Sequence, residues 1–311
     1  MRLVSAKRSN PSRLISSGAG FVLTGLVFCG HPLAQAGSPQ PTSGPAVSIE
    51  RHYVAGETLT YEMKGSNHGW EYEIQAGDLV KKDANGVFYD EIGWSNLKSN
   101  APMELSPASL AFRQTLSLTS ATYLTVPDLS KVQPFVIGPI TDLLTFYSDL
   151  FLANQLKLNQ VRQHIYFEHG KPNSWADGTH VLVGQDAIDF DLTLLEADAS
   201  RHTATILVKH VPPKHPQVQL TAKWMEAPVG EAANNWVQVT KASDGKYVAE
   251  VGEEVFEDRL VIDTNDGKII SAQLHNPVTS IQRECEDASL SKCGAPKPNN
   301  ILREVSLVLR P

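Results

Sequence analysis

The chain has 311 residues, of which 41% are hydrophobic and 20% charged, and its 34 acidic residues outnumber its 27 basic ones. This composition excludes wholesale disorder, which needs a much lower apolar content, and it excludes collagen-like and disulfide-dense chains. The acidic excess also argues against nucleic acid as a main partner, because phosphate backbones would be repelled on average.

Residues 1–36 have the pattern of a secretory signal peptide. Basic residues and no acidic ones precede an apolar stretch from Leu14 to Cys29, and Ala34-Gln35-Ala36 then offers small residues to a signal peptidase. The apolar stretch is shorter than the roughly 20 strongly apolar residues that span a bilayer. We therefore expect cleavage after Ala36, a periplasmic or secreted location, and no transmembrane segment in the mature chain.

Cys29 offers a second interpretation, in which a lipid anchors the mature chain. A lipoprotein signal requires a small residue before the cysteine, and Phe28 is large, so a cleaved signal is favoured. The residues that follow, 37–47, are rich in proline, glycine and serine and should form a flexible leader. No low-complexity linker interrupts the remainder, so residues 48–311 are expected to form a single β-rich domain.

Cys285 and Cys293 are the cysteines that remain after the signal peptide. In an oxidising compartment they should form a disulfide, and closing so short a loop stabilises a fold by about 2–3 kcal/mol in the chain-entropy model. Two thiols at this spacing, without further ligands, do not make a zinc site. The pair therefore predicts a structural disulfide and no thiol catalysis.

Alternation of apolar and polar residues dominates the chain from Glu50 onward. Leu59, Tyr61 and Met63 share one face of an expected strand, and the alternation looks clearest over Leu110–Leu118, which we expect to be a strand with one packed face. The pattern predicts a mainly β (β-rich α+β) fold, a large curled antiparallel sheet or half-barrel of about 10–12 strands. Other strands are expected over Trp70–Ile74, Val87–Trp94, Val181–Val183, Ile188–Leu195, Ala204–His210, Trp236–Thr240, Tyr247–Val251, Arg259–Thr264, Lys268–Leu274 and Ile301–Leu309, with hairpin turns at Asn85-Gly86, Asp244-Gly245 and Asp266-Gly267.

One main amphipathic helix is expected over about residues 138–156. Gly138-Pro139 places a proline at a favourable first helical position, and apolar residues recur behind it at helical spacing. Asp142 and Asp149 belong to the opposite, polar stripe. A helix about 25–30 Å long can pack on the concave face of a curled sheet, either as a core element or as one wall of a ligand cavity.

Histidines and carboxylates gather between His164 and Asp191, and they include His169 and His180. Asp189 and Asp191 would point to the same side of a strand, so a metal site at His164, His169 and His180 in an exported hydrolase is one interpretation. The spacing of these histidines matches no common metal motif, and a solvated loop is the favoured explanation of the composition. We therefore expect no metal and no cofactor.

Other catalytic patterns are weak. The segment Gly65-Ser66-Asn67-His68-Gly69 has the glycines of a nucleophile elbow but places asparagine at its centre. No phosphate-binding glycine loop occurs. Acidic residues close to Trp70, Tyr89 and Trp94 would suit a sugar-binding platform, although aromatic residues on strands usually belong to a core.

The segment Tyr53–Glu62 resembles the opening strand of exported bacterial proteins with the lipoprotein-carrier (LolA/LolB-like) half-barrel. The segment Val261–Leu274, which contains Asp266-Gly267-Lys268-Ile269, resembles their closing hairpins. The resemblance covers less than half of the chain. It implies a large antiparallel sheet curled around helices, with an acyl chain or another apolar ligand bound between sheet and helices without catalysis.

These features together predict an exported binding or carrier protein for an apolar, acyl or lipid-like ligand, with no catalytic residue. Burial of an acyl chain contributes about 25 cal/mol per Å² and can drive binding without dedicated polar contacts. An exported hydrolase and an envelope structural or assembly protein with a protein partner stay open as alternatives. The expected lining residues are Phe112 and Leu116 from the sheet and Leu143, Leu144, Tyr147 and Phe151 from the helix.

Overall fold

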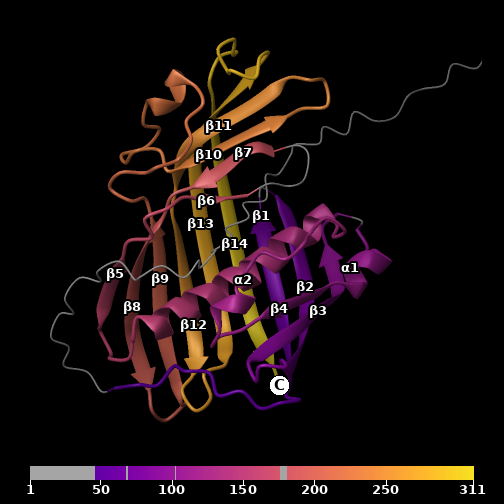
Figure 1. Cartoon of the computed structure of the whole chain (residues 1–311), viewed down its shortest axis with the longest axis vertical. Coiled ribbons are helices and arrows are strands. Elements are labelled where there is room, and N and C mark those ends of the chain that lie inside the picture. The colour runs from indigo at the N-terminus through magenta and orange to yellow at the C-terminus, as the bar shows by residue number, and fades with distance from the viewer. Residues whose placement is uncertain (1–45, 68, 102, 176–180) are drawn as a thin grey trace, which may run out of the picture.

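The computed structural model of the chain describes residues 46–67, 69–101, 103–175 and 181–311 (Figure 1). The expected signal peptide, the alternative lipid anchor at Cys29 and most of the leader lie outside the described residues. The end of the leader is bound to the fold. Ala46 forms an isolated bridge with Gln160, and the N–H of Val47 donates to the carbonyl oxygen of Asn159 at 2.7 Å.

All of the described strands join one antiparallel sheet, which has 14 strands and does not close into a barrel. The fold is therefore mainly β with one main helix, as the sequence predicts, although the strands are more numerous than expected. From one edge to the centre the order is β4 (Arg113–Leu116), β3 (Phe88–Ser99), β2 (Trp70–Lys82), β1 (Thr58–Asn67), β14 (Lys297–Arg310) and β13 (Ile269–Cys285).

Beyond β13 the sheet divides into two arms. Two consecutive strands, β11 (Tyr247–Glu254) and β12 (Phe256–Asp263), both pair with β13 and are separated only by Val255. The Asn235 side chain binds the backbone at the point where β11 ends. It donates to the carbonyl oxygen of Glu254 at 2.9 Å and accepts from the Glu254 N–H at 2.8 Å. One arm continues from β12 through β9 (Thr203–Val211), β8 (Asp189–Asp198) and β5 (His164–Phe167), and the other from β11 through β10 (Trp236–Lys241), β7 (Val181–Asp186) and β6 (Asn173–Ser174), at the top of Figure 1.

The main helix, α2 (Pro134–Gln155), crosses one face of the sheet (Figure 1). It begins earlier than the expected residue 138, and Pro139 lies inside the helix. The reason is that Pro134 already occupies the first turn, where a missing N–H costs nothing. Every residue from Val136 to Ala153 is buried, including the polar stripe. By length and by a mean hydropathy of 1.3 the helix could span a membrane, but 94% of its most apolar 18-residue stretch is buried, as in a core helix.

The expected strand over Leu110–Leu118 is wrong in its first half. Residues Pro107–Ala111 form a short helix, α1, because the side chain of Ser106 accepts a hydrogen bond from the N–H of Ser109 at 3.1 Å and Pro107 starts the helix. β4 keeps the expected alternation, with its second and fourth residues buried. Two short 3-10 helices, η1 (Ala121–Tyr123) and η2 (Lys223–Glu226), complete the helical elements among the described residues.

The predicted hairpin turns and the predicted disulfide are confirmed. Gly86, Gly245 and Gly267 lie at positive φ in the turns that join β2 to β3, β10 to β11 and β12 to β13. Cys285 and Cys293 form a disulfide. Cys285 belongs to a small second hydrophobic cluster under β10 and β11, separate from the main core beneath α2.

Candidate functional site

The interface between α2 and the sheet, where an apolar ligand was expected, is filled by side chains. Neither the groove described below nor a smaller pocket between residues 46–50 and 154–159 is lined by any of the six expected residues. The apolar stripe of α2 therefore serves as core. Five of the six residues are buried in the main hydrophobic cluster and the sixth packs against it half-buried; they are Leu116, Leu143, Leu144, Tyr147 and Phe151, and Phe112.

The residues of the alternative metal site lie apart or outside the described residues. His180 is outside them. His164 on β5 pairs with Asp191 on β8 at 2.6 Å, and about half of its side chain is exposed. The backbone N–H of His169 donates to Asp189 at 3.0 Å, and burial lowers the pKa of the His169 imidazole. The described part of this region thus contains one surface pair, His164 with Asp191, and no three-ligand group.

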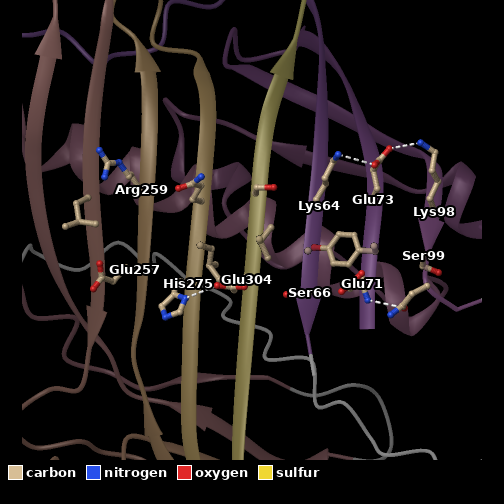
Figure 2. Close-up of a pocket in the computed structure, with 18 of the residues that line it drawn as sticks. Lys64, Ser66, Glu71, Glu73, Lys98, Ser99, Glu257, Arg259, His275 and Glu304 are labelled. Carbon is tan, nitrogen blue, oxygen red and sulfur yellow. Dashed lines mark hydrogen bonds and ion pairs between the residues drawn. The ribbon is translucent and has the colours of Figure 1, made fainter. Parts of the chain in front are cut away.

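A groove of about 890 Å³ hollows the face of the sheet opposite α2 (Figure 2). Because successive residues of a strand point to opposite faces, Arg303 on β14 contacts Asp142 of α2 while Glu304 points into the groove. Side chains from β1, β2, β3, β8, β9, β12, β13 and β14 form its floor and walls. The groove is therefore built by the central strands.

Strand register places one row of groove side chains across the sheet. At one end Glu73 pairs with Lys98 at 2.7 Å and with Lys64 at 3.2 Å, so both lysine charges are engaged. The row then continues through two uncharged residues to a third cation and ends at an apolar residue. From β3 to β9 it consists of Lys98, Glu73, Lys64, Ser306, Gln273, Arg259 and Leu207.

Arg259 is the exposed cation of this row without an ion pair. No ion pair and no side-chain hydrogen bond of its guanidinium occurs among the described residues, and Figure 2 marks none between Arg259 and the other residues drawn. The nearest acidic row is engaged elsewhere, since Glu257 pairs with Lys209 at 3.2 Å and Glu304 with His275 at 3.4 Å. Arg259 therefore offers a planar donor fork to a ligand in the groove.

Beside Arg259 the groove has a small apolar wall. Leu207 is the direct cross-strand neighbour of Arg259, and Leu195 on β8 also lines the groove. Both leucines are half-buried. An available guanidinium next to exposed aliphatic surface is the chemistry that recognises an anionic group attached to an apolar chain.

A second set of polar side chains lies buried between α2 and the sheet, and we call it the inner polar cluster. Asp142 of α2 pairs with Arg303 of β14 at 2.8 Å. Asp149, about two turns further along α2, lies 2.9 Å from Nε2 of His210 on β9. Asp258 on β12 lies beside this second pair. All five residues are at most 7% exposed.

Burial governs protonation in the inner polar cluster. It raises the pKa of Asp149 to about 7, and it raises the pKa values of Asp142 and Asp258 as well, the latter with a further contribution from the neighbouring Asp149. Burial also lowers the pKa of His210 to about 3. The imidazole is therefore neutral at physiological pH, when it can act as a hydrogen-bond partner or a metal ligand.

Sequence reasoning missed three members of this cluster. His210, Asp258 and Arg303 each stand in the inward phase of a strand, two residues from buried apolar side chains. A charged or imidazole side chain in the inward phase of an otherwise apolar face is the signal that could have identified them.

No protein-family model matches this chain, and no curated protein matches it either. Any assignment of function therefore depends on the groove and the buried clusters themselves.

Proposed function

We propose that the protein is an exported, non-catalytic binding or carrier protein whose ligand is anionic and amphipathic, such as an acyl chain with a carboxylate or phosphate head group. The ligand occupies the groove on the face opposite α2. Its head group contacts Arg259, and its first methylene groups lie on Leu195 and Leu207. The single observation that carries the proposal is the unpaired Arg259 guanidinium beside half-buried leucines in a groove of about 890 Å³.

This site differs from the one that the resemblance to lipoprotein carriers implies. In that arrangement the ligand lies between sheet and helix, but here the corresponding space holds the core side chains of α2. A groove open along one side also suits a carrier, because a ligand can leave it without unfolding the core. Charge-assisted hydrogen bonds to the head group contribute about 1.5–3 kcal/mol, and the chain adds about 25 cal/mol per Å² buried.

Fluorescence titration tests the site. Dansyl-undecanoic acid and its uncharged primary amide serve as probes, and wild-type protein is compared with Arg259→Gln and Leu207→Ser. We expect the acid to bind more tightly than the amide, and Arg259→Gln to weaken acid binding about tenfold or more while it leaves amide binding unchanged. Leu207→Ser should weaken both probes.

Arg201→Gln is the matched control, because Arg201 is an exposed arginine that pairs with Asp198 at a turn and lies outside the groove. Its titrations should equal those of the wild type. If the wild type binds neither probe, or if Arg259→Gln and Arg201→Gln behave alike, the groove is not an amphiphile site. Native mass spectrometry of gently purified protein supplies the complementary measurement, a bound mass that Arg259→Gln loses.

Export is a separate part of the proposal and has its own test. Intact-mass measurement of protein recovered from the cell envelope should give a mature chain that begins at Gly37, directly after Ala36. A chain that retains residues 1–36 and stays in the cytosol would contradict export without bearing on the groove.

A further inference from the structure

Three residues of the inner polar cluster converge from three separate elements. Asp149 comes from α2, His210 from β9 and Asp258 from β12, and one possible ligand atom of each lies within 4.8 Å of the other two. His210 Nε2 lies 2.9 Å and 3.0 Å from the two oxygens of Asp149. Two ligands about 2.0–2.1 Å from a tetrahedral zinc ion stand about 3.3 Å apart, so small side-chain movements would accommodate an ion.

We propose that Asp149, His210 and Asp258 form a buried site for a divalent metal ion, and that Zn²⁺ is the ion that fits these ligands best. One imidazole nitrogen and two carboxylates are a ligand set that zinc accepts, whereas calcium and magnesium prefer six or more oxygen ligands. A second carboxylate oxygen or a water molecule completes the coordination.

The charge balance around the site favours a cation. Arg303 is the buried cation that acts on the Asp258 carboxyl, and it is already engaged by Asp142 at 2.8 Å. Buried carboxylates without compensation are strongly unfavourable. The excess of buried carboxyl groups over buried cations must therefore be neutralised by protons or by a metal ion. The buried carboxyls on which Arg303 acts belong to Asp142, Asp186, Glu254 and Asp258, and the buried Asp149 adds one more carboxyl beside Asp258.

Asp258 provides a second, independent observation. Its side chain is fully buried, and among the described residues no N–H or O–H group of another side chain or of the backbone donates to either carboxyl oxygen. The Asp149 carboxyl is its close neighbour, near enough for the two to share a proton. A metal ion would replace that proton and satisfy the oxygens that have no donor.

The imidazole is also held in place for coordination. The ring of His210 packs 3.7 Å from the Phe256 ring and 4.6 Å from the Phe190 ring, measured between centroids. These contacts orient Nε2 toward Asp149 of the helix. A metal ion here would therefore link α2 to β9 and β12 and stabilise the packing of the helix on the sheet.

Metal content and cobalt substitution test the site in the full-length mature protein. Protein from zinc-supplemented cells, dialysed against metal-free buffer, should retain about one equivalent of zinc by plasma mass spectrometry. Protein unfolded in urea with a chelator and refolded with Co²⁺ should show the visible absorption bands of tetrahedral cobalt. Its melting temperature should also exceed that of protein refolded without metal.

His210→Gln and Asp258→Asn should each abolish the zinc content and the cobalt spectrum. His164→Gln is the matched control, because His164 is a histidine paired with an aspartate, Asp191, at the surface. It should retain both signals. If either cluster variant fails to fold, the cobalt spectrum of refolded wild type decides the question alone.

Wild type that contains no zinc, gives no cobalt spectrum on refolding and melts at the same temperature with and without metal would overturn the proposal. So would a zinc content that His164→Gln removes and that Asp258→Asn retains. Neither result bears on ligand binding in the groove, which uses different residues on the opposite face of the sheet.

Discussion

Arg303 on β14 and Asp142 on α2 form an ion pair of 2.8 Å with only 9% and 3% of their side chains exposed. The hydroxyl of Tyr72 lies 3.5 Å from the same carboxyl group. Glu304, the next residue of β14, points into the groove on the other face. One short segment of β14 therefore joins the helix to the sheet on one side and forms the groove floor on the other.

We predict that Arg303→Met destabilises the fold by about 3–5 kcal/mol, because it leaves Asp142 and the neighbouring carboxyls buried without their cation. The free energy of unfolding from urea titration, followed by circular dichroism, measures the change. The double variant Arg303→Met, Asp142→Leu should recover much of the loss, since it removes both charges and keeps the volume apolar. A double variant less stable than Arg303→Met alone would contradict this explanation, because it would show that the pair contributes more to stability than the neutralisation of a buried charge.

A pair of buried aspartates makes stability depend on pH. Burial, with a further contribution from the adjacent carboxyl of Asp90, raises the pKa of Asp78 to about 9. Burial also raises the pKa of Asp90, although a hydrogen bond from the Tyr53 hydroxyl at 2.7 Å opposes the shift. In the unfolded chain an aspartate titrates near pH 4. Between these values the folded state binds more protons than the unfolded state, so stability falls as pH rises.

We predict that the free energy of unfolding decreases between pH 6.5 and pH 9, by up to about 1.4 kcal/mol per pH unit for each proton difference. His210, whose pKa is lowered to about 3 in the fold, opposes the trend only at the lower end of this window, where part of the unfolded-state imidazole is still protonated. Asp78→Asn should flatten the slope, because the amide does not titrate. Asp244→Asn, at an exposed turn, is the control and should leave the slope as in wild type. A slope that Asp78→Asn leaves unchanged would show that Asp78 does not carry the effect.

Alternation allowed most strands to be predicted, and its failures have physical causes. β8 and β9 were found within a few residues because long runs of period two mark a sheet with one buried face. β5 and β6 were missed because four and two residues are too few to show a period. The start of α2 was misplaced because Pro134 and Pro139 are equally good helix starts by sequence alone.

The candidate sites were harder to predict than the fold. The sequence predicts that Asp142 and Asp149 share a polar stripe of α2. Their partners Arg303 and His210 come from strands far along the chain. Their convergence depends on how α2 crosses the sheet, which local patterns do not specify. The groove has the same origin, since Arg259 and Leu207 become neighbours only through the pairing of β12 with β9.

The disulfide offers a separate test of stability. We predict that the double variant Cys285→Ala, Cys293→Ala loses about 2–3 kcal/mol of unfolding free energy, because the closed loop is short. Urea titration measures the loss, and the wild type in reducing agent should lose a similar amount. Ligand binding in the groove should not change, since the disulfide lies at the far end of β13. A variant as stable as wild type would indicate that the loop stays closed without the bond.

Two Asp-Gly turns provide a matched pair of glycines. Gly245 and Gly267 both have positive φ, at +87° and +73°, so an alanine at either position costs about 1 kcal/mol in backbone conformation alone. A Cβ on Gly245 would meet no atom within 4 Å, but one on Gly267 would overlap the backbone of Glu50 and Arg51. The segment that follows the leader is bound at this turn, since the N–H of His52 donates to Asp266 at 2.8 Å.

We therefore predict that Gly267→Ala destabilises the fold by about 2–4 kcal/mol, clearly more than Gly245→Ala at about 1 kcal/mol. The reason is that the backbone of residues 50–52 must move away from the turn and lose its hydrogen bond to Asp266. Urea titration compares the two variants, and limited proteolysis should show faster cleavage near His52 in Gly267→Ala only. Equal losses of stability in the two variants would mean that residues 50–52 contribute little to the fold through this contact.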